Sequence, residues 1–460
     1  MATELLVRIY RVGFGDCIYV EFPDGEDTFT MLIDCGTSAG ADVVLKPIVK
    51  HVRSKLPADQ NGKPRLDLLV VTHPHADHLK GFDPEYFQGI TIGRIWMTVF
   101  MNKAHPQAHK AQAFEEAAFE AAKSLLARPG LNLSPGSQSL LARSLSLNNT
   151  DVLAALRQGL PSVHPRLYVA RDVADRMNAA ERKQHSFGME DGVATFRGFQ
   201  DRGTCLRVLA PEWDIDGTYL GRFNPAGSAF MDPLLSRTQA YGSDTESAEA
   251  GEAPASGQPP APSVPQPVNI SARDFRLLRG QLLYSAMAFS QEDDDLKNNV
   301  SVVLLLEWGG RRLLFTGDAE FDGTGLRQGQ RNCSWDVMLS NQNVKDILLK
   351  PLDLFKVAHH GSHNGSPFDS QGDFQLLDKM VSPNRTHVLV STVVGVHGKK
   401  NPVPFVPLMK EFGRLAANHQ AYQEGEPGLI NEPQPRRTDR ESDSTDPNVD
   451  YLEVTFPPLT

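Results

Sequence analysis

The amino-acid sequence predicts an α/β fold whose strands end in side chains that bind metal. Two observations lead to this prediction. Apolar runs such as residues 68–71, Leu-Leu-Val-Val, alternate with segments that have helical spacing of apolar residues. Histidine and aspartate directly follow several of these runs, most densely at residues 72–78, Thr-His-Pro-His-Ala-Asp-His. Four side chains of the metal-ligand type within six positions favour a metal site over an ordinary polar loop.

The elements expected along the first half of the chain define three segments. Residues 1–102 form the N-terminal half of the core domain, with strands over 5–22, 29–35, 66–72 and 92–99 and a helix over 41–55. Residues 103–188 are expected as a helical insertion, because Ala, Leu, Glu, Lys and Arg recur at helical spacing over 107–128 and 138–160. Core strands return in residues 189–212.

Three more segments complete the chain. Residues 213–295 are expected as a second insertion, which contains a predicted disordered stretch, 242–268, too poor in apolar residues to order itself. Residues 296–422 form the C-terminal half of the core domain, with strands over 300–307, 311–316, 352–358 and 386–393. Residues 423–460 are expected as a flexible tail, polar and Pro-rich over 423–449, with a terminal strand at 451–456.

The composition limits the classes of function. The chain has 460 residues, 40% of them hydrophobic, so it can bury a large core. Its net charge of −10 argues against a basic protein that coats nucleic acid, but not against a nuclease whose metal supplies positive charge. The four cysteines form no C-x-x-C pair and are expected as reduced thiols. The N-terminus does not resemble a signal peptide, and the sequence has no run of about 18 apolar residues. We therefore expect a cytoplasmic protein with no membrane contact.

The spacing of the metal motif predicts two half-shells of ligands. Residues two apart on a strand share one side, so His73 and His75 can bind one metal. A helix that starts near Ala76 would turn Asp77 and His78 toward a second cation. One short peptide would therefore contribute ligands to two metals.

Polar side chains at other strand ends complete the predicted site. Asp318 follows a small residue and an apolar run, and a carboxylate there can bridge two cations. One of the adjacent pair His359 and His360 can ligate the second metal while the other faces substrate. Asp16 and Asp34 are expected to orient ligands rather than to bind metal themselves.

The order of these motifs resembles that of metallo-β-lactamase-fold hydrolases, and in particular the nuclease-like domain of bacterial competence and DNA-uptake proteins. Six motifs typical of that branch occur in order: G-x-G-D at 13–16, L-I-D-x-G at 32–36, H-x-H-x-D-H at 73–78, an N-x-S strand at 299–304, G-D at 317–318 and H-H-G-S at 359–362. The resemblance implies a four-layer αββα sandwich that binds two divalent metal ions, zinc or manganese.

The same resemblance implies a role for each matched residue. His73 and His75 would hold the first metal. The second metal would be held by Asp77 and His78, with Asp318 as the bridge and His360 or His359 completing the shell. The residues implied in catalysis are Asp77, His359 and His360. Four residues are implied to support the ligands without binding metal themselves: Asp16, Asp34, Asn299 and Ser301.

Two segments depart from the family pattern. Lactamases carry a further histidine in a G-H-x-x-G-S segment, where this chain has Asn298 and Asn299, so the first metal would have fewer ligands. The competence branch ends its last core segment in G-H-P, whereas here His397 is followed by Gly-Lys-Lys-Asn-Pro. His397 either substitutes for that histidine from a shifted position or belongs to a surface loop.

Two cations about 4 Å apart can share a hydroxide and stabilise the attacking and leaving oxygens of a phosphoryl group. We therefore expect a metal-dependent phosphodiesterase that acts on DNA, RNA or a nucleotide, with Lys356 and His397 as candidate substrate contacts. One alternative is a hydrolase of a small non-nucleotide ester, such as a phosphocholine, a lactone or a thioester. Another is a regulatory module with a vestigial site that binds a protein partner. The helical insertion is the expected surface for such a partner.

Overall fold

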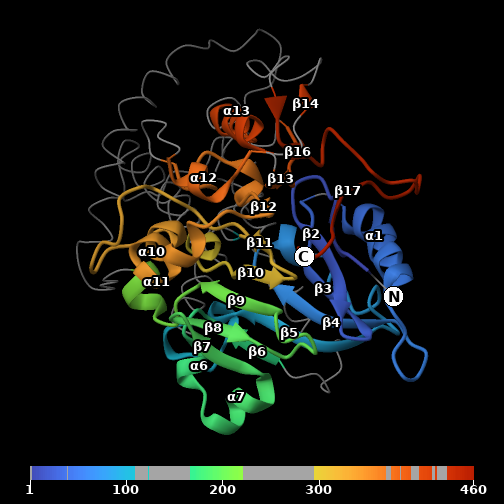
Figure 1. The fold of residues 1–460 in the computed structure, drawn as a ribbon, viewed down its shortest axis with the longest axis horizontal. Coiled ribbons are helices and arrows are strands. Elements are labelled where there is room, and N and C mark those ends of the chain that lie inside the picture. Colours follow the sequence, from blue (N-terminus) through green and yellow to red (C-terminus); the bar gives the residue numbers. More distant parts are fainter. Residues whose placement is uncertain are drawn as a thin grey trace, which may run out of the picture.

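The computed structural model describes residues 3–38, 40–108, 123, 166–220, 295–368, 375–383, 385–394, 403–416, 420–421 and 433–459. The predicted disordered stretch 242–268, His397 and most of the predicted helices over 107–160 lie outside these residues. Within the described residues, two large sheets pack face to face, and helices cover their outer sides (Figure 1).

The first sheet has seven strands in the described part of the chain, in the order β17-β1-β2-β3-β4-β5-β6. Their bounds are Leu5–Tyr10 for β1, Cys17–Asp24 for β2, Asp27–Cys35 for β3, Arg65–Val71 for β4, Thr91–Thr98 for β5, Arg166–Val169 for β6 and Tyr451–Phe456 for β17. The strands from β3 to β6 are parallel. Their carboxyl ends therefore meet at one edge of the sheet.

The second sheet, counted over the same described residues, has eight strands in the order β16-β13-β12-β11-β10-β9-β8-β7. Their bounds are Phe187–Glu190 for β7, Val193–Phe196 for β8, Cys205–Ala210 for β9, Val303–Trp308 for β10, Arg311–Phe315 for β11, Leu354–Lys356 for β12, His387–Val390 for β13 and Arg436–Arg437 for β16. The strands β11, β12 and β13 are parallel, so the loops that follow them also meet at one edge. A separate pair joins β14, Gln420–Ala421, to β15, Pro433–Gln434.

The helices lie on the outer faces of the two sheets. Their bounds are Ala41–Lys55 for α1, Ala76–Leu79 for α2, Val173–Arg176 for α6, Ala179–His185 for α7, Ser334–Ser340 for α10, Gln342–Leu348 for α11, Gln375–Met380 for α12 and Val406–Leu415 for α13. Short turns of other helix types are η1, Val99–Met101, η2, Asp216–Leu220, and η3, His359–Gly361. Among the described helices, none combines the length and the apolar character needed to cross a bilayer.

Among the described residues, three apolar cores separate four layers. One core packs α1 against the first sheet, a second lies between the sheets, and a third packs α10 to α13 against the second sheet (Figure 1). On β10, Leu304 and Leu306 belong to the core between the sheets, while Leu305 belongs to the core under the helices. Successive strand residues point to opposite faces, so the unbroken apolar run of β10 serves both cores. The four-layer αββα sandwich is thus confirmed.

Several predicted elements are confirmed at or near their expected bounds. The helix over 41–55 is α1, and the terminal strand over 451–456 is β17. The predicted hairpin is formed by β10 and β11, and it turns at Gly309 and Gly310, which both have positive φ. Glycine adopts this backbone region without strain, which is why the sequence signal for the turn was clear.

Two segments differ from expectation. The described end of the predicted helical insertion contains β6, which pairs in parallel with β5. Its four residues are mostly half-buried, so they carry little of the apolar pattern by which a strand is predicted. Residues 434–439, within a stretch expected as flexible, are buried or half-buried against the fold. Arg437 is fully buried there and pairs with Asp439 at 2.8 Å, a pairing that polar composition alone does not show.

Candidate metal centre

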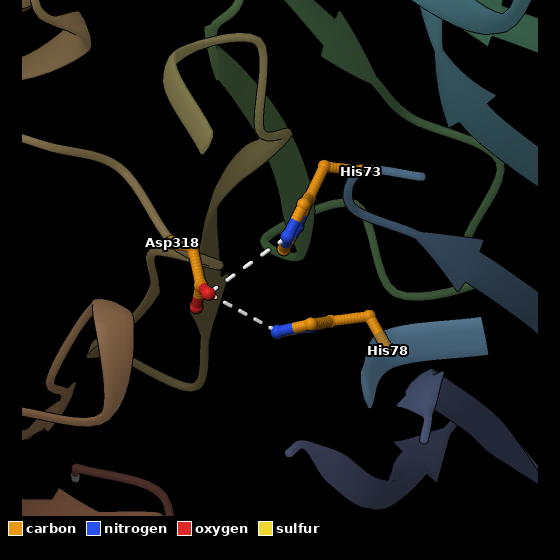
Figure 2. Close-up of side chains that lie close together, drawn as sticks. All are labelled: His73, His78 and Asp318. Carbon is orange, nitrogen blue, oxygen red and sulfur yellow. Dashed lines mark ion pairs between the residues drawn. The ribbon is translucent and has the colours of Figure 1, made fainter. Parts of the chain in front are cut away.

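The candidate metal centre lies where loops from both sheets meet. His73, His75, Asp77 and His78 follow β4 in the first sheet, and Asp318 follows β11 in the second. In Figure 2 the side chains of His73, His78 and Asp318 point toward one another from these two segments. Residues 240 or more positions apart in the sequence thus form one buried cluster.

Asp318 is the centre of this cluster. Its Oδ2 lies 3.2 Å from His78 Nε2 and 3.8 Å from His73 Nε2 (Figure 2). The same oxygen lies 3.6 Å from His360 Nε2. His360 Nε2 is also 3.6 Å from Asp77 Oδ2. A carboxylate oxygen this close to three imidazole nitrogens stands in the position expected of a bridging ligand.

The predicted ligands form two overlapping groups. In one group, ligand atoms of His73, His78 and Asp318 all lie within 4.8 Å of one another. In the other, the same holds for Asp77, His78 and His360. His75 belongs to neither group, but its Nδ1 lies 3.0 Å from His73 Nε2, so the structure places it beside the first.

Unsatisfied buried atoms show that this donor set fits a cation. Within the described residues, His78 Nε2, His360 Nε2, Asp77 Oδ1 and Asp318 Oδ1 are buried and have no hydrogen-bond partner. Buried polar atoms without partners are costly, and native proteins rarely retain them without a ligand, water or ion. Imidazole nitrogen and carboxylate oxygen are donors that zinc and manganese accept.

Hydrogen bonds behind the cluster orient its imidazoles. The buried Asp34 carboxylate lies 2.8 Å from His78 Nδ1 and accepts from the Thr72 backbone N–H at 2.8 Å. His360 Nδ1 lies 3.0 Å from the carbonyl oxygen of Ser391. In both residues the hydrogen bond at Nδ1 turns Nε2 toward Asp318, as in many metal sites.

Other residues expected behind the ligands occupy different places. The Ser301 hydroxyl accepts from the Asp318 backbone N–H at 3.2 Å and so supports the bridging position. The Asp16 backbone N–H donates to the Asp77 carbonyl at 3.2 Å. The side chain of Asn299 instead donates to Glu320 at 2.8 Å, away from the ligands.

The pKa values of the buried histidines and aspartates in this cluster depend on one another. Burial opposes ionisation of Asp318, but His78 and His360 outweigh it and hold the pKa of that carboxyl well below its usual range. Burial likewise opposes charge on His78, yet Asp318 and Asp34 raise its pKa well above that of a free imidazole. The pKa of His73 is lowered by burial and by its neighbour His78. Asp318 and His78 therefore favour each other's charged forms.

Lys356 does not lie where the sequence analysis placed it. Its side chain is fully buried, and Nζ donates to Asp16 Oδ2 at 2.7 Å and to the Val357 carbonyl at 3.0 Å. Two of its three ammonium donors are thus engaged in the interior, and no part of the side chain is exposed to reach a substrate at the mouth. The prediction of Lys356 as a substrate contact is therefore wrong, and His397, the other candidate, lies outside the described residues.

The two adjacent histidines differ in burial and in their neighbours. His360 is fully buried with Asp77 and Asp318, whereas 20% of the His359 side chain is exposed. His359 Nδ1 lies 3.4 Å from Glu320 Oε1, a carboxylate that sequence reasoning missed. The signal was available, because Glu320 follows Asp318 at the same spacing of two that joins His73 and His75.

Comparison with known proteins agrees with this architecture. Residues 10–84 match the family model of the metallo-beta-lactamase superfamily, a segment that runs from the end of β1 through the His73–His78 motif. No curated protein matches the chain. The match and the two-sheet sandwich support the metallo-β-lactamase fold, and the histidine and aspartate groups fit a metal-dependent hydrolase.

Proposed function

We propose that this protein is a metal-dependent phosphodiesterase that acts on nucleic acid or on a nucleotide. The observation that carries the proposal is the position of Asp318 Oδ2 within 3.8 Å of three imidazole nitrogens. An oxygen that lies close to imidazoles of both ligand groups suits a pair of cations, and such pairs serve in-line displacement at phosphorus. The order of motifs, which resembles the competence nuclease-like branch, supports a nucleic-acid substrate.

In this proposal each ligand keeps the role that its position supports. His73 and His75 would hold the first cation. The second cation would be held by Asp77, His78 and His360. Asp318 would bind both cations. When bound, two zinc or manganese ions would supply the positive charge that activates water and stabilises the phosphoryl oxygens.

The protein itself fixes and shields the ligands. Asp34 and Ser391 orient His78 and His360 through Nδ1, and the ring of Phe14 packs on His360 with centroids 4.1 Å apart. An apolar ring there keeps solvent away from the buried imidazole. His359, on the solvent side, would face the substrate. A partner at the helical insertion and a cytoplasmic location stay predictions from the sequence.

The test is hydrolysis of bis-(p-nitrophenyl) phosphate after chelation and add-back of zinc or manganese. Asp77→Ala should abolish the restored turnover, because the Asp77 carboxylate lies 3.6 Å from His360 Nε2 and belongs to the second ligand group. Asp346→Ala, at an exposed carboxylate, should not. Single-stranded DNA, RNA and cyclic nucleotides would then be compared as substrates. Turnover of a lactone or thioester without any phosphodiester turnover would reject the proposal in favour of a small-ester hydrolase.

A further inference from the structure

We infer that Glu320 is a positioning residue, which holds the His359 imidazole in a single tautomer on the solvent side of the metal centre. Its effect on turnover rests on the proposed function, but its effect on the imidazole does not. Glu320 would act through His359 and would touch neither metal nor substrate.

The Glu320 carboxylate is buried, with 3% of the residue exposed, and both of its oxygens accept hydrogen bonds. Asn298 Nδ2 donates to Oε1 at 2.9 Å, and Asn299 Nδ2 donates to Oε2 at 2.8 Å. The Glu320 backbone N–H donates to the Ser334 hydroxyl at 3.2 Å. A carboxylate with this many partners is fixed in place.

The orientation of the supporting amides is fixed as well. Asn299 Oδ1 accepts from the Ser334 backbone N–H at 2.7 Å, so its Nδ2 must be the atom that faces Glu320. Asn298 can offer only its amino group to a carboxylate, because an ionised carboxylate accepts and does not donate. Ser334 and Glu320 together therefore determine which way the Asn299 amide points, and Glu320 determines the orientation of the Asn298 amide.

His359 lies between these two groups. Its Nδ1 is 3.4 Å from Glu320 Oε1, and among the described residues this buried atom has no aligned hydrogen-bond partner. Its Nε2 lies 3.5 Å from Asn298 Nδ2, which is a donor. A carboxylate at one nitrogen and an amino group at the other both favour the proton on Nδ1, which leaves the Nε2 lone pair as an acceptor.

The backbone shows that the position of His359 is imposed by its surroundings. His359 and His360 have φ of 47° and 53°, a left-handed region that residues other than glycine rarely adopt. Such conformations persist where neighbouring structure holds them, often at functional sites. Here they direct His360 into the metal cluster and His359 toward Glu320.

The same contacts argue against Glu320 as a metal ligand. Both of its oxygens are engaged by asparagine amino groups, and it belongs to none of the candidate metal groups found among the described residues. Removal of the carboxylate should therefore leave the metal content unchanged.

A double-mutant cycle tests the inference in the metal-loaded enzyme. Glu320→Gln replaces two acceptor oxygens by one, so it should lower kcat by about 10–100-fold, with little change in KM. In the His359→Ala background the same substitution should have no further effect. Glu212→Gln, which removes another buried carboxylate, paired with Arg171, is the matched control for structural loss. The inference would be overturned if the losses in kcat of the two single variants added up in the double variant. It would also be overturned if Glu320→Gln lost metal.

A second measurement does not depend on turnover or on the folding of Glu320→Gln. Long-range ¹H–¹⁵N spectra of the chelated wild-type protein should show the Nδ1–H tautomer for the imidazole whose signals disappear in His359→Ala. An Nε2–H tautomer or a mixture in the wild type would overturn the inference. If no phosphodiester is hydrolysed, the proposed function fails, while the tautomer still decides the role of Glu320.

Discussion

His78 Nδ1 lies 2.8 Å from the fully buried Asp34 carboxylate, and its opposite nitrogen lies 3.2 Å from Asp318. One imidazole thus joins a residue at the end of β3 to a residue after β11. Because the two sheets meet at this contact, the orientation of a single ring couples the ligand loops of both halves of the fold.

Asp34→Asn should weaken metal binding while the fold is retained. The substitution keeps the shape of the side chain but removes the charge that orients and polarises His78. Loss of a hydrogen-bond partner of this kind typically lowers metal affinity by about 10–100-fold. Competition with a chromogenic chelator measures the change. Asp67→Asn, at a largely buried carboxylate that accepts from Thr30, serves as the control and should leave the metal affinity unaltered.

Alanine substitutions at the two adjacent histidines should give different metal contents. His360→Ala removes a nitrogen that lies 3.6 Å from both Asp77 and Asp318, so the purified variant should retain less metal. His359→Ala should retain the wild-type metal content and lose activity, because His359 lies on the solvent side. Elemental analysis after dialysis separates the two cases. Equal metal loss in both variants would contradict this assignment.

Metal affinity should rise with pH through the neutral range. The pKa values of His78 and His360 are raised, because Asp318 and neighbouring carboxylates outweigh the opposing effect of burial. Metals need neutral imidazole, so protons compete at these two residues below their raised pKa values. Asp77 and Asp318, with lowered pKa values, stay ionised and add no pH dependence there. Up to about two protons per protein should be released on loading.

The release of protons is measured by calorimetric titration in buffers of different ionisation enthalpy. Chelator competition at several pH values gives the affinity directly. An affinity that is constant from pH 6 to 8 would show that both imidazoles are already neutral in the metal-free protein.

Lys356→Met should destabilise the protein by about 3–5 kcal/mol, because it leaves the buried Asp16 carboxylate without its partner. Chemical unfolding of the chelated protein measures the loss. Lys356→Met combined with Asp16→Leu removes both charges and should recover part of the stability. A variant with wild-type stability and a raised KM would restore Lys356 as a substrate contact.

The sequence predicted the parts of the site that are local in the chain. The His73–His78 motif carries its own geometry, since a strand end and a short helix place its side chains on one side. Lys356 was misplaced because a lysine is ordinarily exposed, and its burial depends on Asp16, 340 positions away. Glu320 escaped notice because its partners Asn298 and His359 come from two separate short helical segments of the chain. Side chains that are paired only after folding leave little trace in the sequence pattern.

The pairing of β1 with β17 also constrains how the chain can fold during synthesis. Leu5 is opposite Phe456 in the register of the two strands. Until residues 451–456 have left the ribosome, β1 is an open edge with unpaired backbone groups, which neighbouring chains can extend. Non-local pairing of this kind is slow and exposes intermediates to aggregation. A nascent chain stalled before residue 451 should therefore depend on chaperones more than the finished chain does.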